Sequence, residues 1–175
     1  MKKKVLSILV AGCLGTMAGA AVADSGNISF VGEITTSACS IGGGQLGANM
    51  VVPMGSISNN VFTGVGSKGP ETEFEISLLG CDTTVSSAAA FTFRPGAGSI
   101  VDGRLLSLEN GAGAQGVAVG LADSAGPITI GTATSPYNLV DGTNVLRFKA
   151  YYEAVNSTVT AGPANARAVF EVTYS

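Results

Sequence analysis

The sequence predicts an all-β protein built as a β-sandwich. Much of the chain consists of short runs in which every second side chain is apolar or β-branched, the period of a strand with one buried face. Clusters of Gly, Asn, Asp, Ser and Pro separate these runs at short intervals. No run sustains the 3.6-residue period of a helix. Many short strands joined by turn residues are typical of a sandwich.

The first 23 residues are predicted to be a secretory signal peptide. They begin with Lys2–Lys4, continue through an apolar stretch and end with the small residues Ala21 and Ala23. Cleavage after Ala23 would leave 24–175, which is long enough for one domain with a hydrophobic core.

The three cysteines fall into two groups. Cys13 lies in the predicted signal peptide, and because Val10-Ala11-Gly12-Cys13 resembles the lipobox of bacterial lipoproteins, a lipid anchor there is an alternative. Cys39 and Cys81 remain as an even pair in an exported protein, which predicts one disulfide. Closing a loop of about 40 residues would stabilise the fold by roughly 4 kcal/mol in the chain-entropy model.

The first predicted strand, Gly26–Ser37, precedes every hairpin turn, so it must find its partner edge elsewhere. Its core-facing positions are Ile28, Phe30, Gly32 and Ile34.

Three strands follow in the first half of the chain. Pro53 places the strand Asn49–Met54 at a sheet edge, because proline cannot donate to a ladder. Apolar residues alternate with glutamate and serine in Glu73–Cys81, and Pro95 ends the strand Ala90–Arg94.

The second half begins with strands at Arg104–Glu109 and Val117–Ala122, on either side of a loop rich in Gly and Ala. A turn at Asp123–Gly126 leads into a short strand at Ile128–Ile130.

The turn signal Asp141-Gly142 introduces a long strand, Asn144–Ala154. The last strand is Asn165–Tyr174, in which one parity is apolar or aromatic: Ala166, Ala168, Phe170, Val172 and Tyr174.

The composition argues against several classes of function. The chain has no histidine, which removes Ser-His-Asp catalysis and the usual zinc and copper sites. The signal peptide holds three of nine basic residues and none of twelve acidic ones, and the six remaining basic residues are too scattered to bind nucleic acid. Without tryptophan, a platform for stacking sugars is disfavoured. A glycosidase carboxylate pair stays open, but solvated surface carboxylates explain the pattern better, so we predict no enzyme, cofactor or metal.

The whole pattern resembles the pilin subunits of the chaperone–usher (type 1 fimbrial) family. The resemblance rests on four features in fixed order: the alternating leader with Gly32 in its middle, Cys39 soon after it, the strand Phe74–Cys81 that carries the second cysteine, and the ending Asn165–Ser175 with its penultimate tyrosine.

This resemblance implies an incomplete immunoglobulin-like sandwich that lacks its seventh strand. The missing strand leaves a groove, and the C-terminal strand forms one of its walls. A periplasmic pilus chaperone would lend a strand to the groove, and the leader of the next subunit would replace that strand at the outer-membrane usher. Donor-strand complementation of this kind is a known form of β-augmentation.

The resemblance also assigns roles along the chain. It implies a signal peptide at 1–23, a donor-strand extension at 24–37 and a pilin domain at 38–175. In donation, Ile28, Phe30 and Ile34 would enter pockets of the groove, and Gly32 would allow a close approach. The residues implied for the acceptor groove and the chaperone contact are Ala168, Phe170, Val172, Tyr174 and Ser175.

The implied function is that of a structural subunit, major or minor, of a fimbria that supports cell adhesion. The chain would be exported through the periplasm and joined to neighbouring pilins at the cell surface. The alternative is a self-contained secreted sandwich that binds glycans. In that case Gly26–Ser37 is the first strand of a closed sandwich and Gly32 marks a β-bulge.

Overall fold

The computed structural model describes residue 34, residues 36–109 and residues 113–175. The chain forms two units, Met1–Ile34 and Thr35–Ser175, and the fold below is that of the second unit. Of the predicted leader strand, Ile28, Phe30 and Gly32 lie outside the described residues. Ile34 is fully exposed, and the described residues 34, 36 and 37 form no strand.

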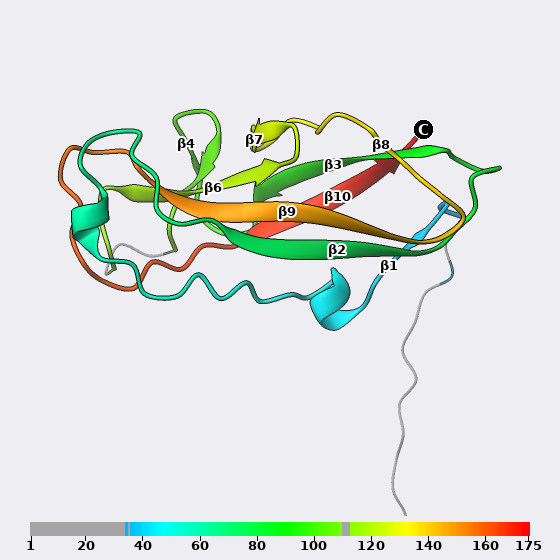
Figure 1. Ribbon diagram of the computed structural model, residues 1–175, viewed down its shortest axis with the longest axis horizontal. Coiled ribbons are helices and arrows are strands. Elements are labelled where there is room, and N and C mark those ends of the chain that lie inside the picture. The colour runs from blue at the N-terminus through cyan, green and yellow to red at the C-terminus, as the bar shows by residue number, and fades with distance from the viewer. Residues whose placement is uncertain (1–33, 35, 110–112) are drawn as a thin grey trace, which may run out of the picture. The chain divides into compact units, whose positions relative to one another are not determined.

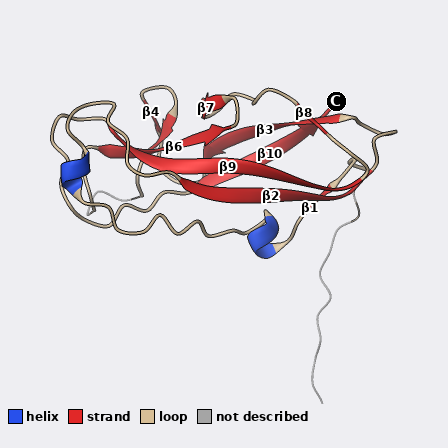
Figure 2. Ribbon diagram, viewed as in Figure 1, coloured by secondary structure: helices blue, strands red, loops and turns tan. Residues whose placement is uncertain are grey.

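The domain consists of two antiparallel sheets, as Figures 1 and 2 show. The first sheet has the order β1-β2-β9-β6-β5-β4, with β7 paired to β6, and the second has the order β10-β3-β8. The strands of the first sheet are β1 Ser40–Ile41, β2 Thr72–Cys81, β4 Ile100–Val101, β5 Leu105–Leu106, β6 Val117–Asp123, β7 Gly126–Ile128 and β9 Gly142–Ala154. Those of the second sheet are β3 Ala88–Pro95, β8 Tyr137–Asn138 and β10 Ala168–Tyr174.

Helical structure among the described residues is limited to two single 3₁₀ turns, η1 Gly44–Leu46 and η2 Asn59–Val61. The described part of the chain contains no helix long and apolar enough to cross a membrane.

The longest strand, β9, is the centre of the first sheet. It pairs with β2 along one side, from Thr72↔Ala150 to Cys81↔Gly142, and with β6 along the other. Buried and more exposed positions alternate from Asn144 to Ala150, whereas all residues from Ala150 to Ala154 are buried.

Aromatic rings from both sheets fill the core. Phe148 of β9 lies 5.3 Å, centroid to centroid, from both Phe91 and Phe93 of β3, and Phe74 stacks on Phe148 at 5.6 Å. Edge-to-face and offset contacts of this kind add about 0.5–1.5 kcal/mol per pair to the burial of the rings. The β-sandwich prediction is confirmed.

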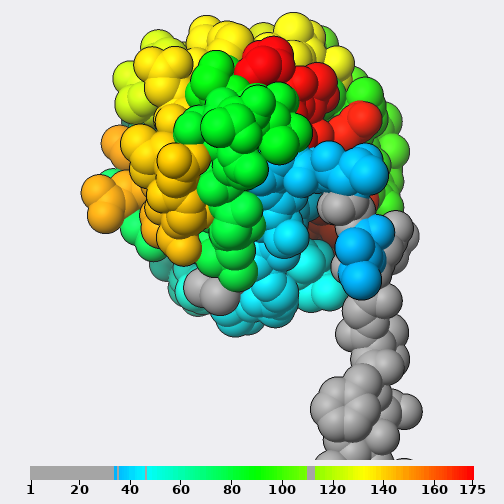
Figure 3. Space-filling model, turned by 90° about the vertical axis from the view of Figure 1, so that its right-hand side faces the viewer, coloured from blue at the N-terminus to red at the C-terminus, as the bar shows by residue number. Residues whose placement is uncertain are grey.

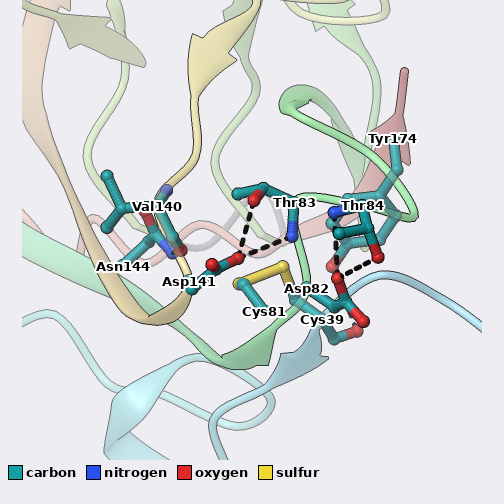
Figure 4. The surroundings of a disulfide bond; sticks show 9 residues. All are labelled: Cys39, Cys81, Asp82, Thr83, Thr84, Val140, Asp141, Asn144 and Tyr174. Atoms are coloured by element: carbon teal, nitrogen blue, oxygen red, sulfur yellow. Dashed lines mark hydrogen bonds between the residues drawn. A yellow bond between two sulfur atoms is a disulfide. The ribbon is translucent and has the colours of Figure 1, made fainter.

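One end of the domain carries the predicted disulfide between Cys39 and Cys81 (Figure 4). The Asp82 N–H donates to the Ala38 carbonyl at 3.0 Å, beside the bridge. The Asp141 carboxylate accepts hydrogen bonds from the backbone N–H and the hydroxyl of Thr83, at 2.8 and 2.7 Å, which ties the loop after β2 to the start of β9.

The outer face of the first sheet is partly covered near the C-terminal end of β9. The Tyr151 ring lies across Gly120 of β6, and the Lys68 ammonium sits 4.5 Å from the centre of that ring. Next to it, Glu153 is almost fully buried and forms an ion pair with Arg104. This pair anchors the turn between β4 and β5 on the sheet.

Several strand predictions differ from the structure. The strand predicted at Ile128–Ile130 lies at Gly126–Ile128, and that predicted at Asn165–Tyr174 begins only at Ala168. Asn49–Met54 is not a strand, because after the turn at η1 the segment forms no ladder with β2 or with any other described strand. The Val51 N–H bonds to the Gln45 side chain at 3.0 Å instead. Of the predicted strand Arg104–Glu109, only β5 is a strand. Arg104 is still in the turn after Val101, and the Ser107 N–H bonds back to the Ser99 carbonyl.

Candidate functional site

The candidate site begins at the free edge of β10. This strand pairs with β3 over its full length, from Ala168↔Pro95 to Tyr174↔Ala89. Within the described residues, no strand pairs with its other side, so β10 ends its sheet (Figure 1). An open edge of this kind presents unpaired N–H and C=O groups to an incoming strand.

Side chains on the inner face of β10 are only half-buried. Phe170, Val172 and Tyr174 pack against the core, and the Phe170 ring lies 6.0 Å from Phe91 and 6.1 Å from Phe93. Residues of the opposite parity point to solvent, where Glu171 pairs with Arg94 at 2.6 Å. The core beneath β10 is therefore not fully covered.

A second row of half-buried apolar side chains comes from the segment Met50–Ile57. Met50, Val52 and Met54 pack against the core, while Val51 between them is 74% exposed. The segment has the alternation of a strand, yet its backbone makes no backbone hydrogen bond to any described residue.

We call these two rows together the acceptor face. Both combine an incompletely covered apolar side with backbone groups that lack ladder partners, those of one edge in β10 and those of the whole segment in Met50–Ile57. An added strand would supply both the missing hydrogen bonds and the missing cover. The acceptor face consists of Met50, Val52, Met54, Ile57, Phe170, Val172 and Tyr174.

The end of β10 lies beside the disulfide. The Tyr174 hydroxyl donates to the Cys39 carbonyl at 3.3 Å, and partial burial raises the pKa of Tyr174 above its usual value. Ser175 and Ala88 exchange both backbone hydrogen bonds at 3.0 Å, so the final residue is fixed against β3. In Figure 3 the C-terminal residues, in red, reach the surface at this end of the domain.

The residues predicted for the acceptor groove occupy different environments. Phe170, Val172 and Tyr174 lie on the half-buried side of β10, whereas Ala168 and Ser175 are exposed. Ahead of β10, Ala164 and Ala166 pack against the core, and the Tyr152 hydroxyl donates to the Ala164 carbonyl at 2.7 Å.

The row Met50, Val52, Met54 and Ile57 was not predicted as part of the site. The sequence predicts Asn49–Met54 as a short edge strand, and Ile57 lies outside every predicted strand. A half-buried row looks the same in sequence whether its partner strand comes from the same chain or from another molecule.

Comparison with known proteins identifies the family. The model of the family described as "Fimbrial protein" matches residues 28–175. The chain belongs to this family. It is 34% identical to long polar fimbria protein A of Salmonella typhimurium, covering 99% of this chain and 97% of that protein. It is also 33% identical to the type-1 fimbrial protein A chain of Escherichia coli, covering 99% and 100%.

Solved fimbrial structures share the fold. A chaperone–usher pilus structure, described as revealing the molecular basis of rod uncoiling, superposes with a TM-score of 0.70 at 25% identity, covering 87% of this chain and 96% of that one. An antigen and type I fimbria protein of Burkholderia pseudomallei gives a TM-score of 0.59 at 37% identity, covering 80% and 91%. The P pilus rod subunit PapA, at 24% identity, matches in fold with a TM-score of 0.64, covering 79% and 100%.

These relationships confirm the resemblance seen in the sequence. The fimbrial protein is a structural pilin subunit that polymerises with neighbouring pilins and belongs to a surface fimbrium. Its family consists of structural subunits.

Proposed function

We propose that this pilin polymerises by donor-strand exchange, with residues 26–37 as the donor and the acceptor face as the receiver. The observation that carries the proposal is the pairing of an open β10 edge with a row of half-buried apolar side chains beneath it. The segment Met50–Ile57 supports it, because its unpaired backbone could bond to the second side of the same added strand.

The donor strand would supply the apolar side chains and the backbone hydrogen bonds that the acceptor face lacks. Ile28, Phe30 and Ile34 would each contribute about 1.5–3 kcal/mol when fully buried. Each ladder hydrogen bond would add roughly 0.5–1.5 kcal/mol. Ala168, Phe170, Val172 and Tyr174 are proposed as the wall that receives these side chains, and Gly32 as the point of closest approach.

The route to the cell surface is part of the proposal. Residues 1–23 would direct export and be removed, leaving an extension at 24–37 and a pilin domain at 38–175. A periplasmic chaperone would cover the acceptor face and hold the Ser175 carboxylate, and an outer-membrane usher would catalyse the exchange for the leader. A subunit with this edge uncovered would associate through it, so a temporary cover is required.

Self-complementation tests the proposal directly. Residues 24–37 are joined by a short flexible linker after Ser175, and the fusion is compared with the chain from residue 38 alone. We expect the fusion to be a monomer with a sharp thermal transition and the shortened chain to aggregate. A shortened chain that is itself a stable monomer would support the closed, self-contained sandwich instead.

A charge in the donor should block assembly. Phe30→Asp would place an unpaired carboxylate in the acceptor face, which is costly, so we expect this variant to bind the chaperone but to be absent from fibres. Ser29→Asp, on the opposite parity, is the matched control and should be incorporated. Normal incorporation of Phe30→Asp, measured by immunoblotting of sheared fibres, would contradict the donor assignment.

A further inference from the structure

We call Ala38–Ser40 the leader root, because the leader ends directly before it. This segment is bonded to two different strands. The disulfide joins Cys39 to the end of β2, and the Asp82 N–H holds the Ala38 carbonyl beside it. From β10, the Tyr174 hydroxyl reaches the Cys39 carbonyl at 3.3 Å (Figure 4). Ala38 and Cys39 are each only 4% exposed, so the root is part of the packed domain.

Tyr174 therefore contacts both functional ends of the subunit. Its ring belongs to the acceptor face, and its hydroxyl touches the segment from which the leader departs. No other side chain among the described residues of the acceptor face makes a hydrogen bond to the leader root.

The strength of this contact depends on whether the acceptor face is covered. At 3.3 Å the hydrogen bond is long, its acceptor belongs to a residue that is 4% exposed, and its donor side chain is half-buried, so competing water can approach it only from the side of Tyr174. A strand laid over the Tyr174 ring would exclude that water and lower the local dielectric constant, and both changes strengthen a hydrogen bond. Covering the face should therefore tighten the hold on the Cys39 carbonyl.

We infer that Tyr174 is a positioning residue for polymerisation, which fixes the leader root of a subunit when the acceptor face of that same subunit is filled. The inference rests on the proposed donor-strand exchange. It adds an energetic coupling between the acceptor face and the leader root of the same subunit. Because coupling between sites is reciprocal, a leader root that is already fixed should favour filling of the acceptor face by the same factor.

Hydrogen exchange on assembled fibres tests the coupling. Fibres of wild type, Tyr174→Phe and Tyr152→Phe are compared by mass spectrometry of the peptide that contains residues 38–41. Tyr152→Phe is the matched control, because its hydroxyl also donates to a backbone carbonyl, that of Ala164, away from the leader root.

We expect Tyr174→Phe to speed exchange at the leader root about threefold to tenfold, the effect of losing one neutral hydrogen bond. Tyr152→Phe should speed exchange around Ala164 and leave the root unchanged. Equal root exchange in wild type and Tyr174→Phe, or equal loosening by Tyr152→Phe, would overturn the inference.

A second measurement uses isolated subunits refolded with a synthetic peptide of residues 24–37. Peptide binding should slow root exchange in wild type and slow it less in Tyr174→Phe. Failure of the peptide to bind wild type would refute donor-strand exchange itself. Normal binding with no slowing at the root would refute only the role of Tyr174, and so would a Tyr174→Phe subunit that cannot bind the peptide.

Discussion

At Gly120 the first sheet has no room for a side chain. The Tyr151 ring lies across this position, and a Cβ atom added there would come within 2.5 Å of the ring. Tyr151 is 1% exposed, so its ring cannot swing into solvent without opening the packing around Lys68 and Arg104. Val117–Ala122 looks like any buried strand in the sequence, and nothing in it marks Gly120 as special.

We predict that Gly120→Ala lowers the free energy of unfolding by about 1–3 kcal/mol, because the methyl group overpacks the site. The measurement is urea unfolding of the self-complemented subunit. Gly43→Ala is the control, since Gly43 has a φ of −73° and a Cβ there would meet nothing within 4 Å. A similar decrease in the free energy of unfolding for both variants would show that the effect is not due to Tyr151.

Three tyrosines should make the folded subunit sensitive to strong alkali. Burial raises the pKa values of Tyr137, Tyr152 and Tyr174, and for Tyr137 the Asp123 carboxylate adds to the effect. A phenol whose pKa is higher in the folded state stabilises the fold fully below its unfolded pKa, which is about 10. That stability is lost as the pH rises through the folded pKa.

We therefore expect the contribution of these phenols to the free energy of unfolding to stay constant from pH 7 to 9 and to fall above about pH 10. Urea unfolding across this range measures it, with Tyr152→Phe as the comparison. The variant should show a smaller fall between pH 9 and 12 than wild type. An identical fall would contradict the assignment to Tyr152.

One face of strand β10 packs toward the core and the other is exposed, so a charge placed on each face should affect donor binding differently. Val172 packs toward the core, while Thr173 is exposed. We predict that Val172→Asp weakens binding of the peptide of residues 24–37 at least tenfold, because the added strand would bury an unpaired carboxylate. Thr173→Asp should change binding less than twofold.

Displacement of a fluorescent copy of the peptide from refolded subunit–peptide complexes measures both affinities, and thermal unfolding of the complexes checks that each variant folds. Val172→Asp that folds and binds normally would show that the donor does not cover this row.

The elements that the sequence predicts well are apolar or alternating runs of five or more residues that turn residues bound. Glu73–Cys81, Ala90–Arg94, Val117–Ala122 and Asn144–Ala154 all lie within observed strands, because most of their apolar side chains are buried in the domain. The two-residue strands β1, β4 and β8 were missed, since two residues are too few to show a period.

At the candidate site, only one of the two rows of apolar side chains in the acceptor face was predicted from the sequence. Phe170, Val172 and Tyr174 were identified through the family resemblance, and their alternation agrees with their position. Asn49–Met54 has a similar pattern, yet no described strand pairs with it. Whether this segment is paired as a strand depends on a partner that the subunit's own sequence does not identify. The pattern alone therefore predicts an ordinary strand.

On the scale of the whole molecule, the disulfide should decide whether the subunit accumulates. It closes a loop of 42 residues, which contributes about 4 kcal/mol in the chain-entropy model. That amount is a large part of the stability of a typical domain. We predict that the double variant Cys39→Ala, Cys81→Ala fails to accumulate with the chaperone in the periplasm.

Quantitative immunoblotting of periplasmic extracts measures this yield. Cys13→Ala is the control and should accumulate normally, because Cys13 lies in the predicted signal peptide. Loss of the subunit from membranes on Cys13→Ala would instead support the lipid anchor. An undiminished yield of the double variant would show that the domain does not depend on its bridge.

The same disulfide has a consequence for unassembled subunits exposed to proteases. Met50–Ile57 lies inside the loop that Cys39 and Cys81 close, and its backbone bonds to no described backbone group, which makes it a favourable place for cleavage. A cut there would leave both fragments covalently attached. A cleaved subunit would stay in one piece and would run as an intact chain in electrophoresis until a reducing agent separated the two fragments.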